Sequence, residues 1–158
     1  MISVTKSYSF SASHRLHSPL LSDQENTAVF GKCNNPHGHG HNYVLSATVR
    51  GEVDERTGLI VPVSVLDRLV HEKVLQLFAH RNINVDVPQF RNLVPTTENV
   101  AVVIAAVLQE HWGEYLGSYE ARLARVHIQE TDRNGVEVLL PAVSEAGRAL
   151  KESELVHA

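Results

Sequence analysis

Apolar and polar residues alternate in four stretches of the chain, and this alternation predicts four β-strands. The stretches are residues 2–12, 41–53, 121–131 and 135–141. The last two are joined by the sequence DRNG, in which Asn134-Gly135 is a strong signal for a tight hairpin turn. Residues 54–58 have the composition of a turn, and residues 59–63 are expected to continue that hairpin until Pro62 closes it.

Two stretches between the second and third predicted strands repeat their apolar residues with the period of an α-helix. Residues 64–78 do so with Ser64 as the expected N-cap, and residues 98–112 follow Thr97 as N-cap and end before Gly113. The order strand, strand, helix, helix, strand, strand indicates an α+β fold. We expect a four-stranded antiparallel sheet with two helices on one face.

The remaining segments show no sustained period. Residues 15–38 form a long loop, which is uncommon inside a compact domain and is usually functional. Residues 82–95 are expected to form an irregular link between the helices. The residues after Pro141 are rich in Ser, Glu and Lys, so we expect one domain over 1–141 and a helical or disordered tail over 142–158.

Composition excludes several classes of protein. Of 158 residues, 43% are hydrophobic and 20% are charged, which is ordinary for a soluble globular protein. The formal net charge of -4 disfavours a nucleic-acid partner, and no apolar run approaches the roughly 20 residues that span a bilayer. One cysteine makes no internal disulfide, and the first residues contain no signal peptide; both point to the cytoplasm.

The stretch CNNPHGHGHNY is the main candidate for chemistry. Residues two apart in an extended chain point to the same face, so His39 and His41 would present two imidazoles side by side. His14 ends the first predicted strand, and antiparallel pairing would bring it to the start of the second. Three imidazoles with an open fourth position are typical of a catalytic zinc site. His37 is interpreted as a loop residue and not as a ligand.

The sequence resembles the 6-pyruvoyl-tetrahydropterin synthase family over roughly residues 4–140. Four segments carry the resemblance: FSASHRL, FGKCNNPHGHGHNY, PTTENVAV and QETDRNGV. The resemblance implies the tunnelling fold, or T-fold, in which trimers close their sheets into a barrel and two trimers stack as a homohexamer. Such closure would cover the two exposed edges of a short sheet.

The resemblance also implies roles for individual residues. By this resemblance, the zinc ligands are His14, His39 and His41. The catalytic thiol is Cys33, and the catalytic histidine is His80. Glu130 corresponds to the carboxylate that anchors the pterin ring, and the pocket-lining segment is Thr96, Thr97 and Glu98.

The implied reaction converts 7,8-dihydroneopterin triphosphate to 6-pyruvoyl-tetrahydropterin with loss of triphosphate. Zinc would act as a Lewis acid on the side-chain oxygens, and Cys33, with a pKa lowered by zinc and an imidazolium, would remove a proton from carbon. The five residues between Cys33 and His39 resemble the pyruvoyl-forming branch more than the 6-carboxytetrahydropterin synthases. For the triphosphate, Lys6, Arg15 and Lys32 are candidates only.

Two positions depart from the family pattern. Ala79 precedes His80 where the family has an aspartate that orients the histidine, and Val65 occupies a second acidic position. Three interpretations stay open: a working pyruvoyl-forming lyase, a 6-carboxytetrahydropterin synthase or dihydropterin side-chain lyase, and a catalytically impaired protein that binds pterin and zinc. Because Cys33, the three histidines and Glu130 are all present, retained pterin chemistry is favoured.

Overall fold

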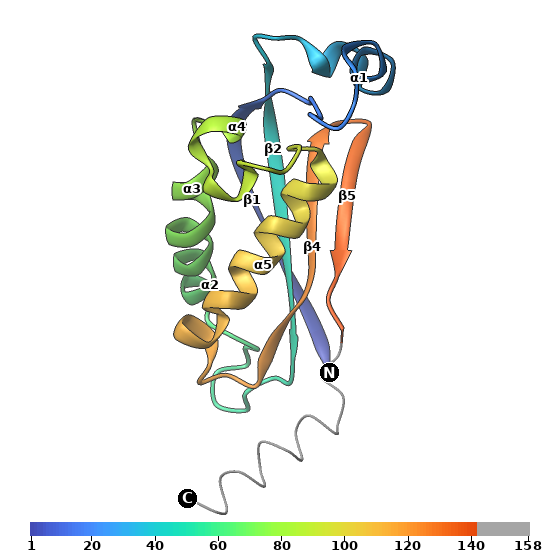
Figure 1. The fold of residues 1–158 in the computed structure, drawn as a ribbon. Helices are drawn as coiled ribbons and strands as arrows, with labels where there is room; N and C mark the ends of the chain where they lie inside the picture. The colour runs from blue at the N-terminus through green and yellow to red at the C-terminus, as the bar shows by residue number, and fades with distance from the viewer. Residues whose placement is uncertain (142–158) are drawn as a thin grey trace, which may run out of the picture.

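The computed structural model describes residues 1–141, and the tail predicted over 142–158 lies outside the described residues. One sheet carries the longer helices on one face (Figure 1), so the predicted α+β class is confirmed. Its strands are β1 (Ile2–His14), β2 (His39–Gly51), β3 (Arg81–Asn82), β4 (Ala121–Thr131) and β5 (Asn134–Leu139). Its α-helices are α1 (Asp23–Phe30), α2 (Val63–Val70), α3 (Gln76–Phe78), α4 (Ile83–Asp86) and α5 (Thr97–Leu116).

The strand order is β3-β1-β2-β4-β5. The four predicted strands form the antiparallel part, β1-β2-β4-β5. The fifth strand, β3, pairs in parallel with the end of β1, where Ala12 lies opposite Arg81 and Ser13 opposite Asn82. The prediction of only four strands was wrong, because a strand of two residues is too short to show an alternating pattern.

The predicted helix over 64–78 appears as α2 and α3 joined by a π-helical turn, His71–Leu75. The predicted N-caps were each displaced. Pro62 precedes α2 in place of Ser64, and Thr96 caps α5 in place of Thr97. Helix α5 also runs through Gly113 instead of ending before it, since its C-terminal turn still buries apolar side chains.

The long loop predicted over 15–38 contains α1 and a 3₁₀-helix, Gly31–Asn34. Helix α1 begins with a capping box: Ser22 accepts from the Glu25 backbone N–H, and the Glu25 carboxylate accepts from the Ser22 backbone N–H. The buried Asn26 side chain then donates to three backbone carbonyls of the same loop. Polar contacts therefore order this segment without an amphipathic pattern.

The predicted strand over 59–63 is absent from the described residues. Asp54 and Leu59 instead close a turn through a backbone hydrogen bond of 3.0 Å. Ile60 and Val61 are both buried in the core, and two consecutive buried residues do not follow the alternation of a half-buried strand.

The core lies between the sheet and helices α2 and α5 (Figure 1). Fully buried side chains come from both layers, among them Tyr43 and Leu45 on β2 and Ile104 and Leu108 on α5. None of the helices in residues 1–141 is long and apolar enough to cross a membrane.

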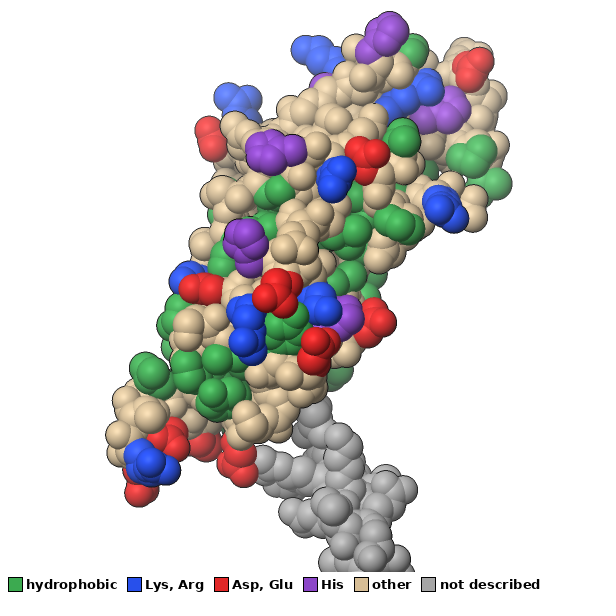
Figure 2. All heavy atoms as spheres, turned by 90° about the vertical axis from the view of Figure 1, so that its left-hand side faces the viewer, with side chains coloured by type: hydrophobic (Ala, Val, Ile, Leu, Met, Phe, Trp, Pro, Cys, Tyr) green, Lys and Arg blue, Asp and Glu red, His purple; other side chains and the backbone are tan. Residues whose placement is uncertain are grey.

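Figure 2 shows the outer surface of the helical layer, where acidic and basic side chains stand side by side. Arg68 and Lys73 lie over the ring of Tyr115, at 5.3 and 5.6 Å from its centroid. The Tyr115 hydroxyl donates to the Glu72 carboxylate, which raises the pKa of Tyr115 to about 12. These contacts join α2 and the π-helical turn to α5.

Candidate metal centre and substrate site

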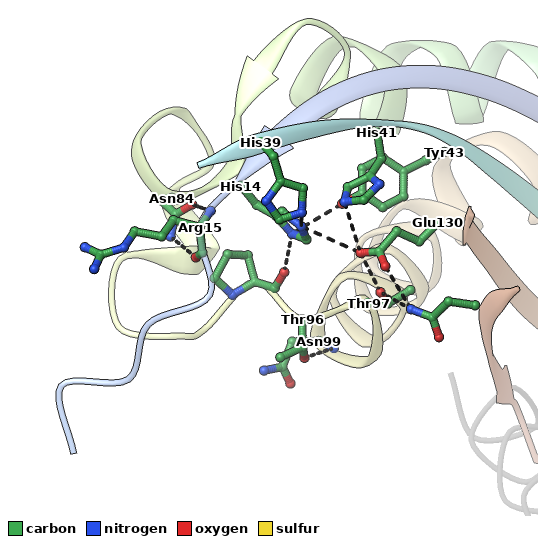
Figure 3. Close-up of polar contacts among 12 residues, drawn as sticks. His14, Arg15, His39, His41, Tyr43, Asn84, Thr96, Thr97, Asn99 and Glu130 are labelled. Carbon is green, nitrogen blue, oxygen red and sulfur yellow. Dashed lines mark hydrogen bonds and ion pairs between the residues drawn. The ribbon is translucent and has the colours of Figure 1, made fainter. Parts of the chain in front are cut away.

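The pairing of β1 with β2 assembles three histidines at one end of the sheet. His14 lies directly opposite His39, and His41 lies opposite Ala12 two positions further along β2. Residues opposite one another in an antiparallel pair share a face, as do residues two apart in one strand. The three imidazoles therefore converge on the helix-bearing face, next to the start of α5 (Figure 3).

The geometry of these imidazoles fits a metal ion. One nitrogen from each of His14, His39 and His41 lies within 4.8 Å of the others, and the Nε2 atoms of His14 and His39 are 3.2 Å apart. Among the described residues, His39 Nδ1 and His41 Nε2 are buried without a hydrogen-bond partner. Orphaned buried nitrogens are costly unless something binds them, and imidazole is a preferred ligand for zinc.

His14 is held in the protonation state that a metal ligand needs. Its ring is buried, and its Nδ1 lies 2.8 Å from the backbone carbonyl oxygen of Pro95. Because a carbonyl oxygen only accepts, Nδ1 carries the hydrogen and Nε2 keeps a free lone pair. Burial lowers the pKa of His14, so the neutral imidazole is favoured at neutral pH.

Glu130, on β4, faces the histidine cluster. Its Oε1 lies 3.7 Å from His14 Nε2 and 3.8 Å from His41 Nε2. Oε1 also accepts from the Thr97 hydroxyl at 2.9 Å, and Oε2 accepts from Asn134 Nδ2 at 2.8 Å. Burial raises the pKa of Glu130, but the two hydrogen bonds and the histidines outweigh it and lower the pKa, so the carboxylate is ionised at neutral pH.

Cys33 lies in the 3₁₀-helix before β2, and its backbone is tied to the end of β1. The Leu16 N–H donates to the Cys33 carbonyl oxygen at 2.8 Å, and the Asn34 amide donates to the Leu16 carbonyl oxygen at 2.7 Å. Burial raises the pKa of the Cys33 thiol, and the nearby Glu130 carboxylate raises it further. A thiolate at this position therefore needs a compensating cation nearby.

Of the predicted pocket residues at the start of α5, some contact the site around Glu130 and others do not. Thr97 is buried and bonds to Glu130, and Thr96 accepts from the Asn99 N–H as the N-cap. Glu98 is exposed, and its side chain forms no hydrogen bond or ion pair within residues 1–141.

His80 lies apart from these residues. It is exposed, has a left-handed backbone with φ of 60°, and donates its N–H to the Ser11 carbonyl oxygen at 2.7 Å. It lines a hollow of about 380 Å³ with Ser11, Ser13 and Asn42. Ser11, Ser13 and Asn42 alternate with the histidine cluster along β1 and β2, so their side chains point to the opposite face of the sheet. His41 also borders this hollow, whereas Cys33 and Glu130 do not line it.

Sequence reasoning missed one buried residue below the cluster. Tyr43 is fully buried, and its hydroxyl lies 3.3 Å from His14 Nδ1. It follows His39 and His41 at the same two-residue interval. The alternation that indicated two ligands on one face thus also indicated Tyr43.

Comparison with known proteins identifies the family. The sequence profile of 6-pyruvoyl tetrahydropterin synthase matches residues 3–140. The human 6-pyruvoyl tetrahydrobiopterin synthase is 47% identical over 131 residues, which cover 83% of this chain and 86% of the human protein. The Drosophila melanogaster protein of the same name is 50% identical over 101 residues, 64% of this chain and 60% of that protein.

Solved structures agree with the fold. Caenorhabditis elegans 6-pyruvoyl tetrahydropterin synthase superposes with a TM-score of 0.79 at 39% identity, covering 89% of this chain and 96% of that one. The Plasmodium vivax 6-pyruvoyl tetrahydropterin synthase structure, at 16% identity, has a TM-score of 0.60 over 90% of this chain and 100% of that one. The T-fold expected from the sequence is thereby confirmed.

Proposed function

Because the chain belongs to the 6-pyruvoyl tetrahydropterin synthase family, we propose that it is a zinc-dependent lyase acting on 7,8-dihydroneopterin triphosphate. The product is 6-pyruvoyl-tetrahydropterin, formed with elimination of triphosphate. The observation that carries this proposal is the convergence of His14, His39 and His41 beside the ionised Glu130.

The metal is held by the three histidines. Zinc supplies Lewis-acid chemistry there, and it suits a set of neutral imidazole ligands. Glu130 binds the pterin ring, since its two carboxylate oxygens accept hydrogen bonds from neighbouring N–H donors of the ring. Thr97 and Asn134 hold this carboxylate in place through its two oxygens.

Cys33 is the base that removes a proton from the substrate side chain. Its proximity to Glu130 shows in the effect of that carboxylate on the thiol pKa. The same negative charge is offset once a cation occupies the histidine cluster, which favours the thiolate.

Lys32 is the best placed of the three candidate residues for the triphosphate. It lines a hollow of about 630 Å³ together with His39, so one substrate can span the metal ligand and this lysine. Lys6 instead pairs with Asp67 at 2.7 Å, and Arg15 donates to the Asn34 carbonyl oxygen at 3.1 Å.

His80 serves the reaction only in an assembly of several copies, because within residues 1–141 it lines a hollow that includes neither Cys33 nor Glu130. A homohexamer of two trimers provides such an arrangement. In that assembly His80 of one subunit exchanges protons with the substrate bound at another subunit.

A catalytically impaired pterin- and zinc-binding protein is the second candidate, and Ala79 favours it. The residues that line the hollow around His80 include Arg81 but no carboxylate. His80 therefore lacks an acidic partner from its own chain within that hollow. A 6-carboxytetrahydropterin synthase or dihydropterin side-chain lyase is distinguished from both by a shortened product.

The deciding experiment is an anaerobic incubation of the zinc-loaded protein with 7,8-dihydroneopterin triphosphate, followed by mass spectrometry. A product without triphosphate but with every side-chain carbon is expected. A shortened side chain would assign the carboxy or side-chain-cleaving reaction instead. Unchanged substrate with zinc bound would reject the lyase, and Ala79→Asp would then be tested for a gain of turnover.

A further inference from the structure

His14 is the most constrained of the three proposed ligands, and the constraints come from outside the cluster. Only 1% of its surface is exposed, and its strand, β1, ends at this residue. The next residue, Arg15, leaves the sheet. Fixing the imidazole therefore requires contacts that restrain the ring and contacts that restrain the backbone after His14.

The Asn84 side chain restrains the backbone of Arg15, the residue after His14. Its Oδ1 accepts from the Arg15 N–H at 2.8 Å, and its Nδ2 donates to the Arg15 carbonyl oxygen at 2.9 Å (Figure 3). One amide thus pairs with both backbone groups of the residue after His14. It continues the hydrogen bonding of β3 with β1 beyond the end of that two-residue strand.

Asn84 is itself fixed within α4. Its N–H donates to the Asn82 side chain at 3.1 Å, and the Asn82 N–H donates to the Asp86 carboxylate at 2.8 Å. The amide therefore meets Arg15 from an ordered turn, so little conformational entropy is lost in forming the two bonds.

The Asn99 side chain restrains the His14 ring indirectly, through the turn that contains Pro95. The His14 ring contacts the Pro95 carbonyl oxygen, and the Asn99 side chain binds the residue before Pro95: Asn99 Nδ2 donates to the Val94 carbonyl oxygen at 2.8 Å. The residue after Pro95, Thr96, is the N-cap that accepts from the Asn99 backbone N–H at 3.3 Å, a bond that Asn99→Ala keeps. The short turn before α5 is thereby held in the geometry that presents its carbonyl to His14 (Figure 3).

We infer that Asn84 and Asn99 are positioning residues of the metal centre, which act on zinc through His14. The inference rests on the proposed zinc site. Neither amide reaches the cluster, so neither is a ligand or a catalytic residue. Their effect is to pre-set the direction of Nε2, which otherwise has to be ordered when the ion binds.

The test measures zinc affinity by competition with a chromophoric chelator, and separately measures the urea midpoint of the zinc-free protein. Asn84→Ala and Asn99→Ala should each raise the zinc Kd about 10-fold. Asn84→Asp keeps an acceptor for the Arg15 N–H but sets an oxygen against its carbonyl. It should therefore also weaken zinc binding, while disturbing the folded structure less than Asn84→Ala does.

Asp54→Ala is the matched control. Asp54 also accepts from backbone N–H groups, those of Arg56 and Thr57, but in a turn that joins β2 to α2, away from the histidines. This variant should lower the urea midpoint and leave the zinc Kd unchanged. Cobalt-loaded protein adds a spectroscopic readout, since the visible bands of cobalt report ligand geometry.

The outcomes separate the inference from the function it rests on. Wild-type zinc affinity and cobalt bands in folded Asn84→Asp and Asn99→Ala would overturn the inference and leave the zinc site intact. A wild-type protein that binds no zinc would overturn the proposed metal centre, and the inference with it. A rise in zinc Kd for Asp54→Ala equal to that of the asparagine variants would reduce the effect to general destabilisation and would also overturn the inference.

Discussion

The Cys33 thiol shows how a single residue depends on its surroundings for reactivity. Burial and the Glu130 carboxylate both raise its pKa, so the protein alone disfavours the thiolate. The cation proposed for the histidine cluster reverses this balance. We therefore expect the basicity of the Cys33 thiol to depend on metal loading.

Removal of the thiol tests its role as the base. Cys33→Ala should lower kcat about 10²- to 10⁴-fold, the usual contribution of a positioned base, while zinc content stays at the wild-type level. Steady-state kinetics and metal analysis of the same preparation provide the two readouts. Unchanged kcat in this variant would show that another group takes the proton.

Glu130→Gln tests the pterin anchor with a side chain of the same shape. The ionised carboxylate offers two charged acceptors, and glutamine offers one neutral acceptor and one donor that faces the ring. Pterin binding should weaken by about 10- to 100-fold, as for the loss of a charge-assisted hydrogen bond. Fluorescence titration of the zinc-loaded protein measures it, and an unchanged Kd would remove Glu130 from the pterin site.

At the residue scale, the structure confirms the predicted convergence of the three histidines, which follows from their spacing. His39 and His41 share a face because a strand alternates, and His14 joined them because its strand ends opposite theirs. No comparable sequence pattern indicated Asn84 or Asn99. Their contribution is two amides that meet backbone groups 69 and 5 residues away, and no periodic pattern records such contacts.

At the scale of elements, one ion pair links the helical layer to the sheet. Asp67 on α2 lies 2.7 Å from the Lys6 ammonium and accepts from the Tyr8 hydroxyl at 2.9 Å. The hydrogen bond from Lys6 is the main reason that the pKa of Asp67 is lowered. This carboxylate therefore joins α2 to β1 in its ionised form.

Asp67→Asn should show a pH-dependent cost in stability. A lowered folded-state pKa adds stability above the unfolded value of about 3.9, and this stability is lost as pH falls through the folded pKa. The variant should be less stable than wild type at pH 7, by under about 1 kcal/mol because the pair is partly exposed. Urea unfolding at pH 7 and pH 3 measures this; the difference should be smaller at pH 3, and an equal difference at both pH values would contradict the ionic origin.

The elements themselves were predictable where they are long and periodic. Strands β1, β2 and β4 and helix α5 appear within a few residues of their predicted ranges. Helix α1 was missed although its capping-box sequence, Ser22 to Glu25, is readable, because no apolar period follows it. The segment before α2 was wrongly predicted as a strand. Ile60 and Val61 are apolar because they are buried in the core, and they form no strand.

At the scale of the whole molecule, the sheet formed by residues 1–141 has two open edges in one copy of the chain. Strand β3 covers only Ala12 and Ser13 of β1, and β5 pairs on one side alone. Open edges are normally covered, and joining the sheets of neighbouring copies covers both at once. In the proposed mechanism, the same closure would let His80 of one copy reach a substrate held at Cys33 of another.

Subunit mixing tests this arrangement. Cys33→Ala and His80→Ala homo-oligomers should each be nearly inactive, and joint unfolding and refolding should restore activity, since some mixed interfaces carry both wild-type residues. Activity of the mixture is compared with that of each variant refolded alone. No recovery in mixed oligomers confirmed by mass spectrometry would place Cys33 and His80 in separate roles.

The long-range supports of His14 also determine when the site can be completed during synthesis. Strands β1 and β2 carry all three histidines in the first part of the chain, but the carbonyl that fixes the His14 ring lies 81 residues after it. At about 5–20 residues per second, that carbonyl emerges roughly 4 to 16 seconds after the histidine. We therefore expect the three histidines to leave the ribosome before the groups that restrain His14, so the proposed metal site would be completed only when the second half of the domain folds over it.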